Sequence, residues 1–239
     1  MITLVSLNTC VDRTLEASGF AVGTHCKARL LAETPAGKAL NAARILARLG
    51  IPARLTGFVG EDRAAWFRDS LDRVPGLEHD LLPLPGRTRI NTTILDPSGN
   101  TETHVRETGE PVAAAAVQRL REELSRNLRS GDWLLFSGSL PPGIGPEDFG
   151  KLLGGFVRNG IRVGADVSDR ALAAAIAAGA SLLKPNREEL ASLVGSDVLG
   201  QGGMAGAAVR LLRERPTLTV LASDGPEGAY LASAAGCWH

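Results

Sequence analysis

The sequence has few cysteines, few aromatic residues and no excess of charge of either sign. Its three cysteines are Cys10, Cys26 and Cys237. They lie far apart and form no C-x-x-C pair, so we expect neither a structural disulfide nor a zinc site. Lys+Arg and Asp+Glu both number 26, a balance that does not favour binding to nucleic acid or to an anionic membrane surface.

Long apolar runs are also missing. No stretch approaches the roughly 20 apolar residues that a membrane span needs. The first residues, MITLVSLNTCVD, lack the basic region and the apolar core of a secretory signal. We therefore expect a cytoplasmic protein without a membrane partner.

What is present is a globular composition, 44% hydrophobic and 22% charged over 239 residues, which suits one domain over 1–239. Apolar patterns of period two alternate with patterns of helical period. Strands are expected at 2–7, 51–60, 132–137, 161–166, 181–184 and 217–223, and helices at 37–50, 63–73, 147–158, 170–178, 187–194 and 204–214. This alternation predicts an α/β fold with a parallel sheet covered by helices on both faces.

One segment breaks the alternation. Residues 88–107, TRINTTILDPSGNTETHVRE, read as a hairpin with D-P-S-G-N at the turn, and both arms are too polar for core strands. Residues 17–31 are similarly strand-like. We expect these parts, roughly 13–33 and 88–107, to form a small β-sheet that covers the end of the main sheet as a lid.

The stretch SLLKPNREEL, residues 181–190, places polar groups where a strand meets a helix. Asn186 and Glu189 have the spacing of a capping box, which is sufficient to explain both. Lys184 is not explained by capping. Only four lysines occur, Lys27, Lys38, Lys151 and Lys184, and a compact ammonium suits a phosphate oxygen in a tight pocket. Chance choice of lysine over arginine is the alternative, which we favour for Lys151.

Other polar groups follow predicted strands, at the edge where open α/β sheets bind ligands. These are Asp12, the helix start with Gly37, Lys38 and Asn41, the turn with Ser137 and Gly138, and the loop with Ser223, Gly225 and Gly228. In addition, Arg89, Asn91 and Arg106 lie on the polar hairpin. Each has a plainer explanation. Asp12 could cap a turn, residues 225–228 could be a hairpin loop, and Arg89 and Arg106 could be solvated cross-strand residues. Their joint occurrence after most strands favours a binding site.

Five segments in order carry a resemblance: NTCVDRT (8–14), AGKALNAARILARLG (36–50), TRINTTILDPSG (88–99), SGSLPPG (137–143) and KPNREEL (184–190). With them the whole chain is similar to the PfkB, or ribokinase-like, carbohydrate kinases, and most of all to the branch of 1-phosphofructokinases and tagatose-6-phosphate kinases. The resemblance implies a ribokinase-like fold and phosphoryl transfer from ATP, with Mg²⁺, to a hexose phosphate, with fructose 1-phosphate first among the candidates. It also makes the lid a candidate interface for a homodimer.

The resemblance assigns roles residue by residue. Asp12 would hold sugar hydroxyls, and Gly37, Lys38 and Asn41 would form the sugar-binding segment. Arg89 and Asn91 would reach the sugar phosphate, together with the lid cations Lys27 and Arg106, and Ser137 and Gly138 would lie near the substrate. Lys184, Asn186 and Glu189 would act on Mg²⁺ and the ATP phosphates, with Asn186 and Glu189 reaching the metal through water, and Ser223, Gly225 and Gly228 would lie near the nucleotide.

The sequence departs from the family pattern in two respects. Ala36 and Ala39 replace glycines of the family, and their methyl groups are expected to crowd the sugar or shift the backbone. The family's catalytic base is the Asp of a G-A-G-D motif, which is expected beyond His239, so no catalytic residue is assigned. A catalytically inactive sugar-phosphate-binding relative, or a truncated kinase, is therefore the alternative. A dinucleotide-binding oxidoreductase is disfavoured because no G-x-G-x-x-G follows the first strand.

Overall fold

The computed structural model describes residues 1–168 and 170–239, with side chains 197–199 and 201 left out. Its main sheet has nine strands in the order β13-β12-β11-β10-β9-β8-β1-β4-β5. The bounds in chain order are β1 (Ile2–Ser6), β4 (Ala53–Gly60), β5 (Leu77–Leu84), β8 (Trp133–Ser137), β9 (Arg162–Asp166), β10 (Leu182–Leu183), β11 (Thr219–Ser223), β12 (Ala229–Ser233) and β13 (Gly236–Trp238). The strands from β11 to β5 run parallel, and β12 and β13 add two antiparallel pairings.

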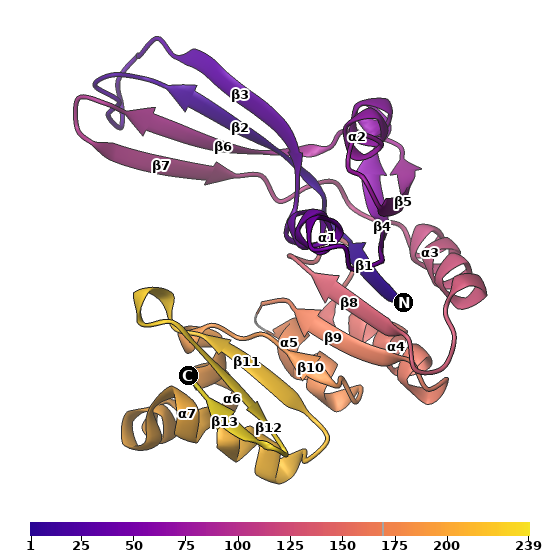
Figure 1. The fold of residues 1–239 in the computed structure, drawn as a ribbon. Coiled ribbons are helices and arrows are strands. Elements are labelled where there is room, and N and C mark those ends of the chain that lie inside the picture. Colours follow the sequence, from indigo (N-terminus) through magenta and orange to yellow (C-terminus); the bar gives the residue numbers. More distant parts are fainter. Residues whose placement is uncertain (169) are drawn as a thin grey trace.

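Helices cover both faces of this sheet (Figure 1). They are α1 (Lys38–Arg48), α2 (Ala64–Leu71), α3 (Ala114–Asn127), α4 (Pro146–Arg158), α5 (Arg170–Ala177), α6 (Arg187–Val194) and α7 (Ser196–Glu214). Strand alternation separates two cores: Leu4 packs with Leu40 of α1 and Phe67 of α2, whereas the next residue, Val5, packs with Leu120 of α3 and Phe149 of α4. The expected α/β architecture is confirmed.

A second sheet of four strands, in the order β3-β2-β6-β7, projects beyond the main sheet (Figure 1). Its strands are β2 (Cys10–Glu16), β3 (Arg29–Ala36), β6 (Arg89–Asp96) and β7 (Thr101–Arg106). The hairpin expected over 88–107 is confirmed as β6 and β7. The strand expected over 17–31 is wrong for most of its length, because residues 17–28 form turns and loop, including Gly19 and Gly23 with positive φ.

The small sheet has two different faces because side chains alternate along each strand. Asp12 of β2 is paired with Asn91 of β6, which is paired with Arg106 of β7, so these three lie on one face. Leu15, Leu30 and Ile94 are paired in the same way on the opposite face. One face of the small sheet is therefore polar. The other, called the apolar face, has apolar residues at Leu15, Leu30 and Ile94 beside the Arg13–Glu33 ion pair.

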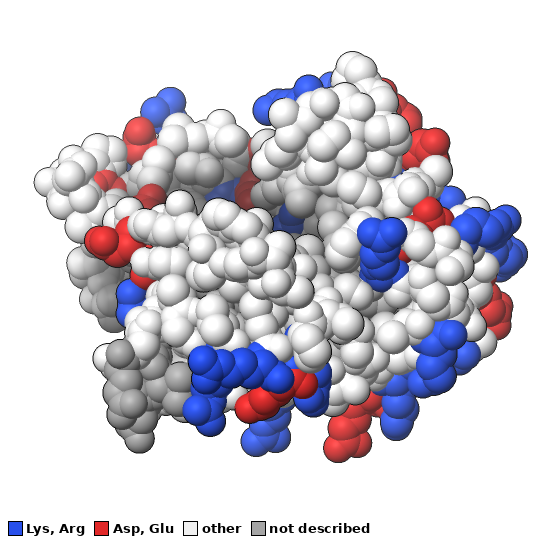
Figure 2. All heavy atoms as spheres, turned by 60° about the horizontal axis from the view of Figure 1, so that its bottom comes forward, with Lys and Arg blue, Asp and Glu red and all other residues white. Residues whose placement is uncertain are grey.

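The charges of the sequence are mixed on the surface as well. On the face that Figure 2 shows, basic and acidic side chains are interspersed along the rim, and uncharged residues form the centre. Over the described residues, no helix combines the length and the apolar character that crossing a bilayer would require.

Candidate active site

The candidate residues gather at the edge where the parallel strands of the main sheet end. Ser137 ends β8, Asp166 ends β9 and Ser223 ends β11, while Lys184 follows β10 directly. The carboxyl ends of parallel strands meet at one edge, and open α/β sheets bind their ligands there.

Asp166 is the centre of this edge, and sequence reasoning did not select it. Its Oδ1 lies 3.4 Å from Lys38 Nζ and 3.6 Å from Lys184 Nζ, and its Oδ2 accepts a hydrogen bond of 2.8 Å from Ser137 Oγ. The Gly138 N–H donates to the Asp166 carbonyl at 2.9 Å. One carboxylate thus joins a lysine of the predicted sugar segment to a lysine of the predicted nucleotide segment. The available signal was a carboxylate at the end of a buried strand.

A second cluster lies on the polar face of the small sheet. Asn91 Nδ2 donates to Asp12 Oδ1 at 3.2 Å and to Cys10 Sγ at 3.0 Å, and Asn91 Oδ1 accepts from Arg89 at 3.2 Å. Arg106 is exposed beside Asn91. The structure therefore brings Asp12, Arg89, Asn91 and Arg106 together, as the resemblance implies.

Cys10 belongs to this cluster, although no role was predicted for it. The thiol is buried, with 2% of the residue exposed, and Sγ lies 3.5 Å from Asp12 Oδ1. Burial, and after it the charge of Asp12, raise the pKa of Cys10 to about 12. The thiol is therefore protonated at neutral pH and can donate to the Asp12 carboxylate.

Asn8 connects the two clusters and was also missed. Its carbonyl accepts two hydrogen bonds from the Arg89 guanidinium, at 2.9 and 3.1 Å, while its Nδ2 donates to Ser139 Oγ at 3.1 Å. The small sheet is thereby tied to the turn after β8. Asn8 stands at the start of the NTCVDRT segment, which was the signal that pointed to it.

The start of α1 supplies the remaining sugar segment. Gly37 is the N-cap with φ 137°, a value that favours glycine, and its carbonyl accepts from the Asn41 N–H at 2.9 Å. The expected crowding of the sugar by Ala36 and Ala39 stays a prediction. Ala36 and Ala39 have no positive φ, and their side chains are buried, Ala39 in the core against Leu40. The methyl groups therefore do not force a strained backbone at these positions.

A third cluster forms at the start of α6. The capping box is present: Asn186 Oδ1 accepts from the Glu189 N–H at 2.8 Å, and Glu189 Oε2 accepts from the Asn186 N–H at 2.9 Å. Asn186 also forms an isolated parallel bridge with Ser223, whose N–H donates to the Pro185 carbonyl at 2.9 Å. The plain capping explanation is thus correct as far as it goes, and it leaves Glu189 Oε1 outside the capping hydrogen bonds.

The remaining candidates are the two loop glycines, Gly225 and Gly228, and the lysine Lys27. Gly225 and Gly228 lie in the loop that joins β11 to the antiparallel β12, so the hairpin-loop explanation holds for them, beside Ser223. Lys27 is exposed in the 17–28 segment, and across the described part of the chain no hydrogen bond or ion pair joins it to another candidate residue. The structure therefore does not bring Lys27 into the site.

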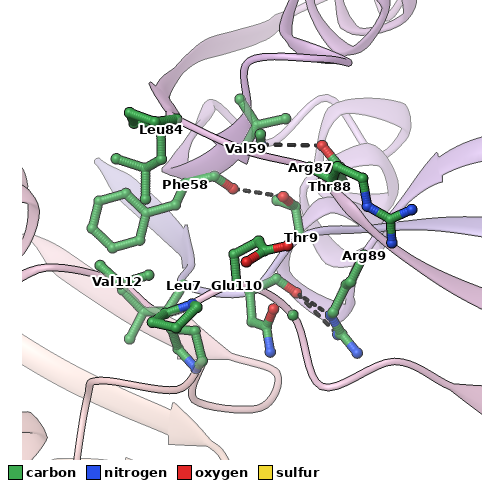
Figure 3. A pocket seen from close by; sticks show the side chains of 16 residues that line it. Leu7, Thr9, Phe58, Val59, Leu84, Arg87, Thr88, Arg89, Glu110 and Val112 are labelled. Carbon is green, nitrogen blue, oxygen red and sulfur yellow. Dashed lines mark hydrogen bonds between the residues drawn. The ribbon is translucent and has the colours of Figure 1, made fainter.

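A hollow adjoins the site at the junction of the two sheets (Figure 3). Its wall combines apolar residues such as Leu7, Phe58 and Val112 with polar ones such as Thr9 and Glu110, and Arg89 also lines it. Arg89 is the one candidate residue that lines the hollow. The hollow is thus a neighbour of the polar clusters and does not contain them.

The oxygen donors fit a magnesium ion that keeps most of its water. Glu189 Oε1 is a carboxylate oxygen outside the capping hydrogen bonds, and Mg²⁺ prefers oxygen ligands while retaining several waters. Within the residues that the structure describes, no group of three or more His, Cys, Asp or Glu side chains could hold a metal directly. A water-mediated site is the kind that this donor set suits.

Comparison with known proteins agrees with the geometry. The family described as pfkB family carbohydrate kinase matches residues 1–239. A 1-phosphofructokinase of Rhodobacter capsulatus is 34% identical over 235 residues, which are 98% of this chain and 74% of that protein.

Solved structures share the fold closely. Phosphofructokinase-2 from Escherichia coli, in complex with fructose-6-phosphate, aligns with a TM-score of 0.91 at 25% identity, over 100% of this chain and 78% of that one. The tetrameric inhibited form of the same enzyme aligns with a TM-score of 0.90, also at 25% identity, over 99% of this chain and 78% of that one. The chain spans about three quarters of the length of these relatives.

Proposed function

The chain belongs to the pfkB family of carbohydrate kinases, and on that premise we propose that it transfers the γ-phosphoryl group of ATP to fructose 1-phosphate. In this reaction a sugar hydroxyl loses its proton and bonds to the phosphorus, the bond to the leaving ADP breaks, and fructose 1,6-bisphosphate forms. Catalysis of such a transfer depends mainly on positioning and on neutralising charge.

The observation that carries the proposal is the Asp166 carboxylate between Lys38 and Lys184, at 3.4 and 3.6 Å. It joins the segment proposed to bind the sugar phosphate to the segment proposed to bind the nucleotide. Two ammonium groups at this junction can offset the negative charge of two phosphorylated substrates.

The remaining roles follow from position. We assign Asp12 to the sugar hydroxyls and Arg89, Asn91 and Arg106 to the sugar phosphate, since all four share one face of the small sheet. Glu189 would orient water on Mg²⁺, which supplies charge neutralisation for the ATP phosphates when it is bound.

Fructose 1-phosphate is proposed because a relative that is 34% identical carries the name 1-phosphofructokinase. Fructose 6-phosphate, which the similar solved enzyme holds, and tagatose 6-phosphate present the same phosphate to the same cations. The alternative, an inactive sugar-phosphate-binding protein, would bind the sugar phosphate without transferring a phosphoryl group to it.

One experiment separates these proposals. The chain is incubated with Mg²⁺-ATP and each of the three sugar phosphates, and ³¹P NMR follows bisphosphate and ADP. Bisphosphate formed fastest from fructose 1-phosphate, lost in Lys184→Ala and kept in the matched control Lys151→Ala, supports the kinase. Binding of sugar phosphate without turnover supports the inactive relative. Absence of both binding and turnover overturns both proposals.

We further propose that the chain pairs with a second copy through the apolar face of the small sheet. Leu30 and Val105 are 56% and 52% exposed there, and the similar Escherichia coli enzyme has a tetrameric form. Light scattering is expected to show a dimer that becomes monomeric in Leu30→Glu/Val105→Glu, and a wild-type monomer at all concentrations would refute this assignment.

A further inference from the structure

An ion pair with two hydrogen bonds, between Arg187 and Asp224, lies beside the third cluster. Arg187 Nε donates to Asp224 Oδ1 and Arg187 Nη2 to Asp224 Oδ2, both at 2.6 Å. The Asp224 side chain is 6% exposed, while that of Arg187 is 53% exposed. Two parallel N–H···O bonds of this kind fix the orientation of both side chains in addition to pairing their charges.

The pair joins two segments that were assigned to the nucleotide separately. Arg187 is the first residue of α6, directly after Asn186, and Asp224 stands between Ser223 and Gly225. The backbone contacts at Ser223 tie the same segments together only up to the end of β11. The ion pair extends this connection into the loop that contains the glycines.

Asp224 also organises that loop internally. Its N–H donates to the Gly228 carbonyl at 2.9 Å, and its carbonyl accepts from the Glu227 N–H at 3.1 Å. Because the side chain of Asp224 is held by Arg187 while its backbone closes the loop, a change in Arg187 is transmitted to residues 225–228.

The pair also balances charge. A buried carboxylate near bound phosphates would repel them if it had no cation. The hydrogen bond from Arg187 to the Asp224 side chain is the largest of the causes that raise the pKa of Arg187. An arginine remains charged at any physiological pH. The loop therefore presents no net negative charge from Asp224.

We propose that Arg187 and Asp224 are positioning residues for the nucleotide, which hold the β11–β12 loop in register with the capped start of α6. The inference rests on the proposed function, since it presupposes that these segments bind Mg²⁺-ATP. It assigns neither residue to the reacting atoms. An ion pair that only stabilises the fold would affect all ligands alike, whereas a positioning pair affects the nucleotide selectively.

The test uses two single variants and the double variant. Arg187→Lys keeps the positive charge but cannot donate the two parallel hydrogen bonds, and Asp224→Asn keeps the shape of the side chain but not its charge. Calorimetry measures the Kd of a magnesium complex of a non-hydrolysable ATP analogue and the Kd of fructose 1-phosphate. Each single variant is expected to weaken nucleotide binding about tenfold, as second-sphere changes at metal sites commonly do, while the Kd of fructose 1-phosphate stays within about twofold. The double variant should be no weaker than the weaker single one, because both act through one contact.

Arg54→Lys is the matched control, because Arg54 pairs with Asp80 at 3.6 Å near the start of β4, far along the strand from the carboxyl edge. It should leave both affinities unchanged. Hydrogen exchange of amides 225–228 should quicken in Arg187→Lys and not in the control, a readout that holds even if Asp224→Asn fails to fold.

Unchanged nucleotide affinity in Arg187→Lys, or equal weakening of both ligands, would overturn the inference and leave the kinase proposal intact. A wild-type chain that binds fructose 1-phosphate but no magnesium nucleotide would overturn the kinase proposal, and the inference would fall with it.

Discussion

The Lys38 ammonium lies 3.4 Å from the Asp166 carboxylate, although 128 residues separate the two in the chain. Lys38 opens α1 directly after the small sheet, and Asp166 ends a central strand of the main sheet. Their contact couples the small sheet electrostatically to the carboxyl edge of the main sheet. The net charge of Lys38, Asp166 and Lys184 decides how tightly the site binds an anion such as ATP and a cation such as Mg²⁺.

Asp166→Asn is expected to change both of these affinities. Without the carboxylate, Lys38 and Lys184 are free for phosphate oxygens, so ATP without metal should bind about fivefold more tightly. The additional affinity that Mg²⁺ gives should shrink, because one anionic oxygen that attracts the ion is lost. Calorimetry with and without Mg²⁺ measures both effects. Ser137→Ala removes the hydroxyl that donates to Asp166 but keeps the carboxylate charge, so it serves as the control. An identical response of the two variants would contradict the electrostatic explanation.

Glu189→Gln separates capping from a role in metal binding. A glutamine oxygen can still accept from the Asn186 N–H, so the free energy of unfolding should change by no more than about 0.5 kcal/mol, whereas Glu189→Ala should lose about 1 kcal/mol. Both variants should lose most of the Mg²⁺-dependent gain in nucleotide affinity, because both lack the carboxylate charge. Urea unfolding and calorimetry give the two quantities. If the glutamine variant keeps the full gain from Mg²⁺, Glu189 is a capping residue only.

Cys10 should resist alkylation despite its place among the proposed sugar-binding residues. Its pKa of about 12 leaves almost no thiolate at pH 8, while Cys26 and Cys237 are exposed. Mass spectrometry after iodoacetamide treatment should find modification at the two exposed cysteines, and at all three after unfolding in urea. Rapid modification of Cys10 in the folded chain would show that the thiol is neither buried nor protonated as described.

The same pKa has a consequence for stability. The ordinary value of 9.0 applies to the unfolded chain, and the folded value is higher. Between the two values the folded state binds more protons, so the contribution of Cys10 to stability is complete below pH 9 and is lost as the pH rises toward 12. Cys10→Ser should remove this part of the pH dependence.

Gly57→Ala should damage the main sheet. Gly57 has φ 132°, and an added Cβ would collide with the backbone of Ser6 on the neighbouring strand. We expect a loss of about 3 kcal/mol in the free energy of unfolding. Gly155→Ala in α4 meets open space and has no positive φ, so it should stabilise by about 0.5–1 kcal/mol. Thermal denaturation should show a lower melting temperature for Gly57→Ala and a higher one for Gly155→Ala. Equal decreases in the two variants would contradict this explanation.

The repeating strands and helices could be predicted because their buried residues recur with a regular period. The prediction failed for elements that lie at the edge of the sheet or have few buried residues. β5 was missed because it is an edge strand that contains Pro83 and polar residues, which an edge tolerates. α3 was missed because only Leu120 and Leu124 are buried along it. β12 and β13 went unassigned for a related reason, as Ala232 is the one buried residue of β12 and all three residues of β13 are exposed.

The site was predicted only as far as local motifs reach. The capping box is local, so Asn186 and Glu189 were found with their correct contacts. Asp166 and Asn8 act through partners more than a hundred residues away in the chain, such as Lys38 and Ser139, and no spacing in the sequence reports such a contact. Lys27 was selected as a lid cation by resemblance, and the structure leaves it outside the clusters.

The position of β1 bears on how the protein is made. This first strand lies between β4 and β8 in the sheet, and the amino group of Met1 pairs with Asp132 at 2.7 Å. During synthesis the N-terminal strand can meet β4 early, but its second edge remains open until residue 137 has left the ribosome. With chain elongation at roughly 5–20 residues per second, that edge is exposed for several seconds. The open edge of β1 is therefore a site for aggregation of the nascent chain until β8 has emerged and the central pairing of the sheet can form.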